Sequence, residues 1–380
     1  MSQHREKVPR HRVLKAVGIT MATVLVVVIG VGVLIYRHLS GNITGVDMNS
    51  ALGTSRPSEI AEPNKPHKAM NILLIGSDTR QGQKGHFGIV AGARSDTTIL
   101  MHINADRTLA YGISIPRDSM VQRPACTMAD GSVDPAGLDM FNAAFSIGGP
   151  TCTVKTVEAL THIRIDHFVE VDFNGFRGMV DAIGGVEVCL PYAVNDDVGH
   201  ITLPAGTHTF DGFQSLQYVR ERHAFSGGSD IGRTYRQQAF LASMANKVIS
   251  AGTLLNPIRL YKFLDAATKS LTTDTGLNSV AKLASFAEQV KGIDRKNIQF
   301  MTVPTGAYPP NPNRVEWLPS ANKIWYRIRF DERLSRAFRD QVTTAAAQSK
   351  PGSGAAPNKH LTPQEAAARA QQAHNNGLCA

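Results

Sequence analysis

An uninterrupted apolar run near the N-terminus constrains this chain more than any other feature of its sequence. From Ala16 to Tyr36 the sequence reads AVGITMATVLVVVIGVGVLIY, 21 residues without a charged side chain. At about 1.5 Å per residue, a helix of this length spans roughly 32 Å, which is enough to cross the hydrocarbon core of a bilayer. We therefore predict a transmembrane helix over residues 16–36.

The charges on either side of this run predict how the helix is oriented. Residues 1–15 carry five Lys/Arg side chains and one acidic side chain, Glu6, and Arg37 follows the run. Basic residues favour the cytoplasmic side, so we expect residues 1–15 in the cytoplasm and the rest of the chain outside. A cleaved signal peptide is the alternative, but the run is longer than a usual signal core and SGNITG, close after it, is a poor cleavage site. A single-pass membrane protein is therefore expected.

The net charge of +9 is concentrated in this N-terminal segment. Residues 1–37 carry six basic side chains and one acidic one, which leaves about +4 for the other residues. Because a nucleic-acid-binding domain needs a broad basic surface, we expect no nucleic-acid partner. Hydrophobic residues make up 42% of the chain and charged residues 19%, so most of it is expected to fold around a packed core.

The four cysteines suit an extracytoplasmic domain, where disulfides persist. Cys126 and Cys152 lie in loop-like or helix-edge contexts, and we expect them to pair. Closing a loop of about 25 residues would contribute roughly 3 kcal/mol in the chain-entropy account. Cys189, in VEVCLP, is expected to be a small buried strand residue, and Cys379 is left unassigned.

Composition divides the rest of the chain into three parts. Residues 37–68 are rich in Gly, Ser, Asn and Pro, and we expect a stalk between the membrane and the folded domain. The domain is expected over residues 69–335, starting at the apolar run AMNILLIG. Residues 336–380 hold many Ala, Gln, Pro and Gly, and we expect a flexible C-terminal tail.

Within the domain, short strand-like runs alternate with longer stretches of helical period. Thr97–Ile103 and Leu109–Ile115 flank the turn NADR and predict a β-hairpin. Further expected strands are HFVEVDF, VEVCLP and NIQFMTVP, and the main expected helices are LDMFNAAFSIGG, TCTVKTVEALTHI, NGFRGMVDAIGG, FDGFQSLQYVRERH, TYRQQAFLASMANKVI, IRLYKFLDAATKSL and NSVAKLASFAEQV. This alternation predicts a mixed sheet covered by helices on both faces.

Charged side chains gather where the expected strands begin or end. Asp78 comes just after the strand AMNILLIG, at the rim where open α/β sheets bind ligands. Arg94 and Asp96 lie two residues apart at the start of the next strand, so their side chains leave the same face. Arg117 follows Pro116, which ends the third strand. Each of these residues could instead be a turn aspartate or part of a structural Arg–Asp pair.

The stretch YVRERHAFSGGSDIGRTYRQQ, residues 218–238, carries arginines on both sides of a glycine-rich turn. Arg220 and Arg222 lie at the end of one expected helix. Arg233 and Gln237 are four apart near the N-terminus of the next helix, so they share one face. A helix N-terminus and the planar guanidinium fork both suit phosphate oxygens. A solvated run of surface charge is the alternative.

Together these residues indicate a site for a phosphate or pyrophosphate with a divalent metal. Two carboxylates, Asp78 and Asp96, at neighbouring strand ends suit Mg²⁺, which takes one or two carboxylates and completes its shell with water and phosphate oxygens. The sequence has no GxxxxGK[ST] loop, GxSxG elbow or HExxH motif. An ordinary nucleotidase, serine hydrolase or zinc protease therefore has little support.

Five segments of the sequence, taken in order, resemble the LytR-CpsA-Psr family of cell-envelope proteins. They are NILLIGSDTR, ARSDTTILMHIN, ISIPRDS, HFVEVDFNGFRGMVDAIGGVEV and YVRERHAFSGGSDIGRTYRQQ. The resemblance implies a three-layer α/β/α sandwich with a mixed central sheet, preceded by one N-terminal transmembrane helix. It also implies an enzyme that transfers a glycopolymer phosphate from a polyprenyl-pyrophosphate lipid to a peptidoglycan sugar hydroxyl.

The same resemblance implies a role for each candidate residue. Asp78 and Asp96 would bind Mg²⁺, and together with Arg117 they would form the catalytic group. The pyrophosphate would be bound by Arg94, Arg117, Arg220, Arg222, Arg233 and Gln237. Whether Asp78 or Asp96 accepts the hydroxyl proton or only binds the metal stays open.

Two other functions fit the same residues. Water in place of the peptidoglycan hydroxyl would make the protein a pyrophosphohydrolase that acts on lipid-linked glycans. A non-enzymatic envelope regulator that binds an anionic polymer would need the arginines but not Asp78.

Overall fold

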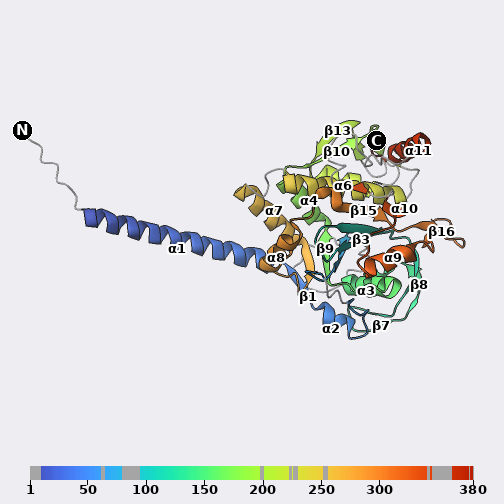
Figure 1. The fold of residues 1–380 in the computed structure, drawn as a ribbon, viewed down its shortest axis with the longest axis horizontal. Coiled ribbons are helices and arrows are strands. Elements are labelled where there is room, and N and C mark those ends of the chain that lie inside the picture. The colour runs from blue at the N-terminus through green and yellow to red at the C-terminus, as the bar shows by residue number, and fades with distance from the viewer. Residues whose placement is uncertain are drawn as a thin grey trace, which may run out of the picture.

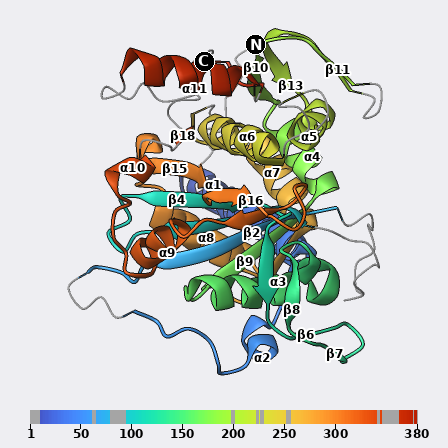
Figure 2. The same cartoon turned by 90° about the vertical axis from the view of Figure 1, so that its right-hand side faces the viewer.

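The folded part of the chain is built on one mixed sheet of eight strands (Figures 1 and 2). The computed structural model describes residues 10–60, 65–78, 95–196, 201–221, 225, 230–250, 256–339, 343–344, 362–375 and 377–379. The strands lie in the order β1 (Thr44–Val46), β14 (Leu271–Asp274), β9 (His167–Asp172), β2 (Met70–Ser77), β3 (Ser95–Ile103), β4 (Ala110–Ile115), β15 (Ile298–Thr302) and β18 (Thr343–Thr344).

The strand directions bring several chain ends to one edge of this sheet. β3 pairs antiparallel with both β2 and β4, which confirms the predicted hairpin around NADR. β9 runs parallel to β2, and β15 runs parallel to β4. The C-terminal ends of β2, β4, β9 and β15 therefore meet the N-terminal end of β3 at the same edge, which we call the site edge.

Helices cover both faces of the sheet, as predicted. On one face Leu73, Leu100 and Ile113 pack in one cluster with Val157 of α3 (Ala143–Thr161) and Trp325 of α9 (Ala321–Arg329). The opposite face packs against α6 (Asp230–Ser250) and α8 (Val280–Val290), and beside α6 lie α4 (Phe173–Ala182), α5 (Gly212–Arg220) and α7 (Pro257–Ser270). The result is a three-layer α/β/α sandwich.

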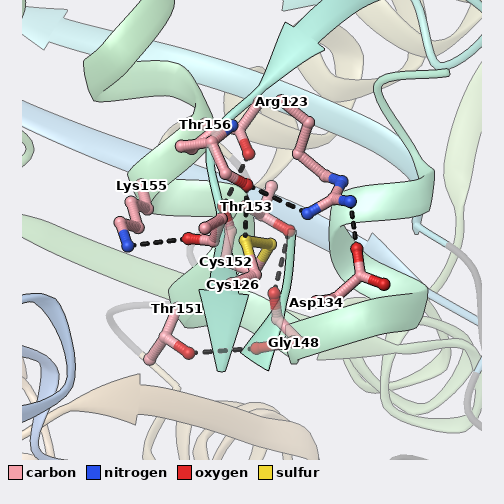
Figure 3. The surroundings of a disulfide bond; sticks show 12 residues. Arg123, Cys126, Asp134, Gly148, Thr151, Cys152, Thr153, Lys155 and Thr156 are labelled. Atoms are coloured by element: carbon pink, nitrogen blue, oxygen red, sulfur yellow. Dashed lines mark hydrogen bonds and ion pairs between the residues drawn. A yellow bond between two sulfur atoms is a disulfide. The ribbon is translucent and has the colours of Figure 1, made fainter. Parts of the chain in front are cut away.

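α3 is bent in its first half and is fixed there by a disulfide. The backbone leaves helical geometry at Gly148 and Gly149, where the two helices expected from the sequence meet. Three residues after the bend, Cys152 forms a disulfide with Cys126 (Figure 3), the pair expected from the sequence. Lys155 donates a hydrogen bond of 2.7 Å to the carbonyl of the residue before Cys126. The loop after β5 (Met120–Arg123) is thereby held against α3.

The N-terminal segment differs from the expected stalk. Helix α1 (Arg10–Asn42) continues past the apolar run, and its last turn packs on the domain through the buried Leu39. β1 then joins the main sheet as a parallel partner of β14. Farther along, Arg56 forms a buried ion pair of 2.6 Å with Glu158 of α3. The prediction of a stalk over residues 37–68 is therefore wrong for residues 39–56, because apolar and charged side chains there have partners in the domain.

The apolar part of α1 projects away from the domain (Figure 1). One helix in the described part of the chain, Val17–Asn42, is long and apolar enough to cross a membrane, with a mean hydropathy of 2.6. None of its most apolar 18-residue stretch is buried in the domain.

The C-terminal segment also differs from the expectation of a flexible tail. Helix α11 (Pro363–Asn375) packs on α6 through the buried Ala373, and Leu378 packs on the same cluster. Cys379 forms a disulfide with Cys189 of β10 (Val186–Leu190). The expectation of a flexible tail is wrong for these residues, and Cys189 is a disulfide partner instead of an isolated buried thiol.

Smaller elements complete the fold. Two-stranded sheets are formed by β10 with β13 (Gly206–Phe210), β11 (Val194–Asp196) with β12 (Ile201–Leu203), β16 (Thr305–Ala307) with β17 (Val315–Trp317), β5 with β8 (Gly137–Met140), and β6 (Cys126–Thr127) with β7 (Val133–Asp134). Short helices among the described residues are α2 (Met48–Leu52), η2 (Arg295–Asn297) and α10 (Arg336–Arg339).

A buried carboxyl at the sheet edge opposite the site edge gives a pH-dependent prediction. Burial raises the pKa of Asp166, although the N–H of Asn71 donates to its Oδ2 at 2.7 Å. A raised carboxyl pKa favours the protonated group in the folded state, so its stabilising contribution is present at low pH and is lost as pH rises through the folded-state pKa. Asp166→Asn keeps an acceptor and removes this loss. We expect the melting temperature of the variant, relative to the parent, to rise between about pH 3 and pH 7.

The matched control is Asp130→Asn, because the Ser132 hydroxyl and N–H hold the pKa of this exposed carboxyl below its usual value. The melting-temperature difference should then change in the opposite direction with pH. A melting-temperature difference between Asp166→Asn and the parent that stays constant with pH would contradict the prediction.

Candidate functional site

Three neighbouring strand ends place acidic side chains along the site edge. Ser77, the last residue of β2, lies opposite Asp172 of β9 on one side and Ser95 of β3 on the other. Asp78 follows Ser77 and Asp96 follows Ser95 in the chain. Because neighbouring strands are about 4.8 Å apart, these carboxyl groups belong to one local region of the edge.

Asp96 sits in an irregularity of the β2–β3 pairing. Gly76 pairs with Thr97, but the next residue, Ser77, pairs with Ser95, so Asp96 is an extra residue in β3. Such a bulge bends the strand and re-aims the side chain of the extra residue. Because of this register shift, Asp96 is not part of the regular alternation of β3 against β2.

Arg117 and Asp96 form a close ion pair at this edge. Arg117 Nη1 donates to Asp96 Oδ1 at 2.6 Å, and Arg117 Nε lies 3.5 Å from Asp118 Oδ2. Their side chains are 11% and 12% exposed, so the pair is shielded from bulk water but remains accessible. The pairing of Thr98 with Ile115 explains the contact, because Asp96 and Arg117 each lie two residues beyond that pair.

Two further carboxyl groups lie on β9 and were not singled out from the sequence. Ser77 Oγ donates to Glu170 Oε1 at 2.6 Å, and burial is the main cause that raises the pKa of Glu170. Burial also raises the pKa of Asp172, whose side chain caps α4 by accepting from the N–H of Gly175. The sequence HFVEVDF could have indicated the burial of Glu170, because alternation along a strand puts Glu170 on the same face as the apolar Phe168.

Arg220 reaches the same edge from the end of α5. Its guanidinium lies 4.6 Å from the ring centre of Phe173, the residue directly after Asp172. The Arg220 side chain is exposed, so its remaining donors face solvent. The predicted capping box at the start of α5, formed by Asp211 and Gln214, is present and fixes where this helix begins.

A close approach between the start of α5 and α4 gives a second prediction. Gly212 N–H donates to Asp181 Oδ1 at 2.7 Å, and a Cβ on Gly212 would lie 2.3 Å from the carbonyl oxygen of Arg177. Gly212→Ala is expected to lower the free energy of unfolding by about 3 kcal/mol, because backbone must move. Urea unfolding measures this loss. Gly292→Ala, where a Cβ meets no atom within 4 Å, is the control, and equal effects of the two changes would contradict the prediction.

The N-terminal half of α6 is buried against α5. The Arg236 guanidinium lies 4.4 Å from the ring centre of Phe225 and donates to the carbonyl of Glu221. Gln237 Nε2 donates to the carbonyl of Val219 at 3.1 Å. Arg233 and Gln237, expected to share a face, are both buried. These contacts tie the start of α6 to the end of α5, so Gln237 has a structural contact in addition to the predicted role.

The next residue of α6, Gln238, connects this helix to the site edge. Gln238 Nε2 donates to Ser114 Oγ of β4 at 2.8 Å and to Thr302 Oγ1 of β15 at 3.0 Å. The helix that carries Arg233 is therefore fixed over the ends of the same two strands.

The predicted site residues thus fall into three groups. Asp78, Asp96, Arg117 and Arg220 lie at the site edge or at helix ends beside it. Arg233 and Gln237 are buried in the adjacent start of α6. Arg94 and Arg222 lie outside the described residues.

The donor set at the site edge fits the predicted Mg²⁺. Asp78 is half-buried and Asp96 is mostly buried, and both offer the hard carboxylate oxygens that this ion prefers. In the part of the chain that the structure describes, no group of three or more His, Cys, Asp or Glu side chains could bind a metal. A metal here would therefore complete its shell with water or with oxygens of a substrate, as Mg²⁺ commonly does.

The sequence matches one known family over most of its length. The profile of the LytR_cpsA_psr family matches residues 35–325. The cell wall biosynthesis protein LcpA of Corynebacterium glutamicum is 32% identical over 324 residues, which cover 77% of this chain and 60% of LcpA. The polyisoprenyl-teichoic acid–peptidoglycan teichoic acid transferase TagT of Bacillus subtilis is 30% identical over 301 residues, which cover 77% of this chain and 87% of TagT. The chain thus spans less than two thirds of LcpA.

Solved structures show the same fold. A structure described as TagT bound to LI-WTA superposes with a TM-score of 0.54 at 25% identity, covering 75% of this chain and 98% of that chain. A LytR-Csp2A-Psr enzyme from Actinomyces oris gives a TM-score of 0.55 at 21% identity, covering 79% and 98%. The second likeness concerns the fold alone.

Proposed function

This chain belongs to the LytR-CpsA-Psr family, and from that membership we propose that it is a phosphotransferase of the cell envelope. It moves a glycopolymer phosphate from a polyprenyl-pyrophosphate lipid to a sugar hydroxyl of peptidoglycan. Relatives whose names state teichoic acid transfer to peptidoglycan support the reaction class. α1 is the membrane anchor, with its basic N-terminal end in the cytoplasm and the domain outside.

The observation that supports this function best is the composition of the site edge. An ion pair joins Asp96 to Arg117 there at 2.6 Å, with Asp78 one residue beyond the neighbouring strand. Carboxylates for a cation and guanidinium groups for phosphate oxygens are what a diphosphate requires. Arg220 adds a further exposed guanidinium beside the end of β9.

The proposed reaction is a displacement at the phosphorus next to the glycan. A peptidoglycan hydroxyl attacks this phosphorus, the bond to the bridging oxygen breaks, and polyprenyl phosphate leaves with the electron pair. The hydroxyl proton passes to a carboxylate at the site edge, Asp78 or Asp96. Arg117 and Arg220 stabilise negative charge on the phosphoryl oxygens, where such transfers need electrostatic stabilisation most.

Asp78 and Asp96 would also bind Mg²⁺ when it is present, which would neutralise charge on the diphosphate. Arg94, Arg222, Arg233 and Gln237 are proposed to complete the pyrophosphate contacts. Gln237 would donate the second N–H of its side-chain amide, because the first is donated to the carbonyl of Val219.

An acceptor-dependence experiment tests the proposed transfer. Purified protein is incubated with lipid-linked glycopolymer, Mg²⁺, and either peptidoglycan fragments or buffer, and products are identified by mass spectrometry. We expect a phosphodiester between glycopolymer and peptidoglycan, formed only with the acceptor. Free glycan phosphate at the same rate without acceptor would identify a pyrophosphohydrolase, and no turnover in either arm would favour a binding protein.

A further inference from the structure

We propose that the exposed first two turns of α7 form a second membrane-contact surface, which lies on anionic lipid headgroups beside α1. This surface consists of Ile258, Arg259, Tyr261 and Lys262, and we call it the α7 surface. It rests on the anchoring role proposed for α1, but it is independent of the transfer chemistry.

Two contacts fix the direction of α7 relative to α1. His38 Nε2 lies 2.9 Å from Asp265 Oδ1, and Asn42 Nδ2 donates to Thr268 Oγ1 at 3.3 Å. A step toward the N-terminus of α1 therefore corresponds to a step toward the N-terminus of α7. The two helices run in the same direction, and the first turns of α7 lie on the side of the domain from which the apolar part of α1 extends (Figure 1).

The helical rise places the α7 surface near the expected membrane boundary. Ile258 precedes Asp265 by two turns, about 10 Å along α7, whereas His38 follows the apolar run by only about 3 Å along α1. If the two helix axes were parallel, Ile258 would therefore lie about 7 Å deeper on the membrane side than the last residue of the apolar run. The helices diverge in Figure 1, so the actual depth is smaller. Helices that lie at an interface bury their apolar side about 5–10 Å below the headgroups.

The side chains of the α7 surface suit this position. Ile258 is 67% exposed and Tyr261 is 38% exposed, a large apolar and an amphipathic side chain at helical spacing of three. Arg259 and Lys262 are exposed on the same two turns. Tyrosine is enriched at membrane interfaces, and basic side chains are attracted by anionic lipids. Exposure to water accounts for the basic side chains but not for the exposed apolar side chains. A lipid surface accounts for both, because its headgroups attract the basic groups and its interface buries the apolar ones.

The charges around this surface are complementary to an anionic bilayer. The single acidic residue of α7, Asp265, already contacts His38 and Lys269. Arg37, at the end of the apolar run of α1, is exposed next to His38. Because Leu39 and Asn42 are buried against the domain, the junction is firm and the α7 surface stays beside the membrane helix. Contact with lipid would hold the domain in one orientation.

Lipid quenching on the full chain tests the position directly. Ile258→Cys carries a fluorescent label, the protein is reconstituted into nanodiscs that contain phosphatidylglycerol, and nitroxide-labelled lipids act as quenchers. The control is Tyr326→Cys, at a position that is 57% exposed. Tyr326 belongs to α9, and this helix lies on the side of the domain away from α1 (Figure 1). We expect quenching at position 258 to be several-fold stronger than at position 326. Equal quenching would overturn the proposal.

Charge reversal tests the lipid preference. Hydrogen exchange of α7 amides is compared between nanodiscs with and without phosphatidylglycerol, for the parent and for Arg259→Glu/Lys262→Glu. We expect about tenfold slower exchange with the anionic lipid in the parent and no such difference in the variant. Protection that is equal in both lipids and survives the reversal would indicate a protein contact and overturn the proposal. Protein that separates from the discs would refute anchoring by α1 as well, which distinguishes the two failures.

Discussion

Arg117→Ala lowers the rate of glycopolymer transfer by about 10²- to 10³-fold, because it removes a charged donor aimed at the site edge. The guanidinium is held 2.6 Å from Asp96 and is only slightly exposed, so it needs no reorganisation to meet developing charge. Single-turnover assays with lipid-linked glycopolymer and a peptidoglycan fragment measure the effect on the chemical step.

Two control variants separate this effect from general loss of folding. Arg117→Lys keeps a positive charge without the planar fork, so it should recover part of the lost rate. Arg327→Ala removes a surface ion pair with Glu332 of 3.3 Å, and its rate should stay within about twofold of the parent. A folded Arg117→Ala protein with the parental rate would remove Arg117 from the proposed catalytic group.

Cys189→Ser/Cys379→Ser lowers the free energy of unfolding by about 5 kcal/mol in the chain-entropy account. The disulfide joins residues that are 190 apart, so its loss enlarges the freedom of the unfolded chain considerably. Local packing adds to this loss: Leu378 is buried, and the backbone at Gly377 approaches the Phe225 ring so closely that a Cβ would lie 2.3 Å from it. Denaturant unfolding of parent and variant provides the measurement.

The Cys126–Cys152 disulfide provides the comparison for that prediction. Its sequence separation is 26, so Cys126→Ser/Cys152→Ser should cost less, about 3.5 kcal/mol. A reversed order of the two losses, or a change below about 1 kcal/mol for the longer loop, would contradict the chain-entropy explanation.

The central sheet and most of its covering helices could be predicted because their apolar patterns are strong. Runs such as AMNILLIG and NIQFMTVP form strands whose two faces pack against the two helical layers. The hairpin predicted around NADR is formed by β3 and β4. α9 was missed, although its residues Ile324, Trp325 and Ile328 have the three-to-four spacing of a buried helix face.

The two ends of the domain could not be predicted because their contacts are distant in sequence. Leu39 packs on the domain and β1 pairs with β14, which lies more than 200 residues later in the chain. At the other end, the Ala- and Gln-rich sequence of α11 only weakly indicates a packed helix. The disulfide of Cys379 and the packing of Ala373 hold this segment on the domain. Composition alone predicted a stalk for the first segment and a flexible tail for the second, because it contains no information on such partners.

The candidate site was predictable in residue type and only partly in geometry. The position of Asp78 at the end of β2 follows from the apolar run before it. The Asp96–Arg117 pair depends on a bulge and on strand register, neither of which a single sequence specifies. The buried Glu170 is a further consequence of register, because Ser77 of the neighbouring strand is its partner.

The affinity for a short-chain prenyl pyrophosphate, measured by calorimetry in the presence of Mg²⁺, tests the account most directly. Its dissociation constant is compared for the parent, Arg117→Ala, Arg220→Ala and Arg327→Ala. The monophosphate of the same prenyl chain is measured as a second ligand. The two site-edge variants should each weaken pyrophosphate binding by about tenfold or more, whereas Arg327→Ala and the parent should agree. Equal dissociation constants for all four proteins would contradict the account, because the diphosphate would then be bound elsewhere or not at all.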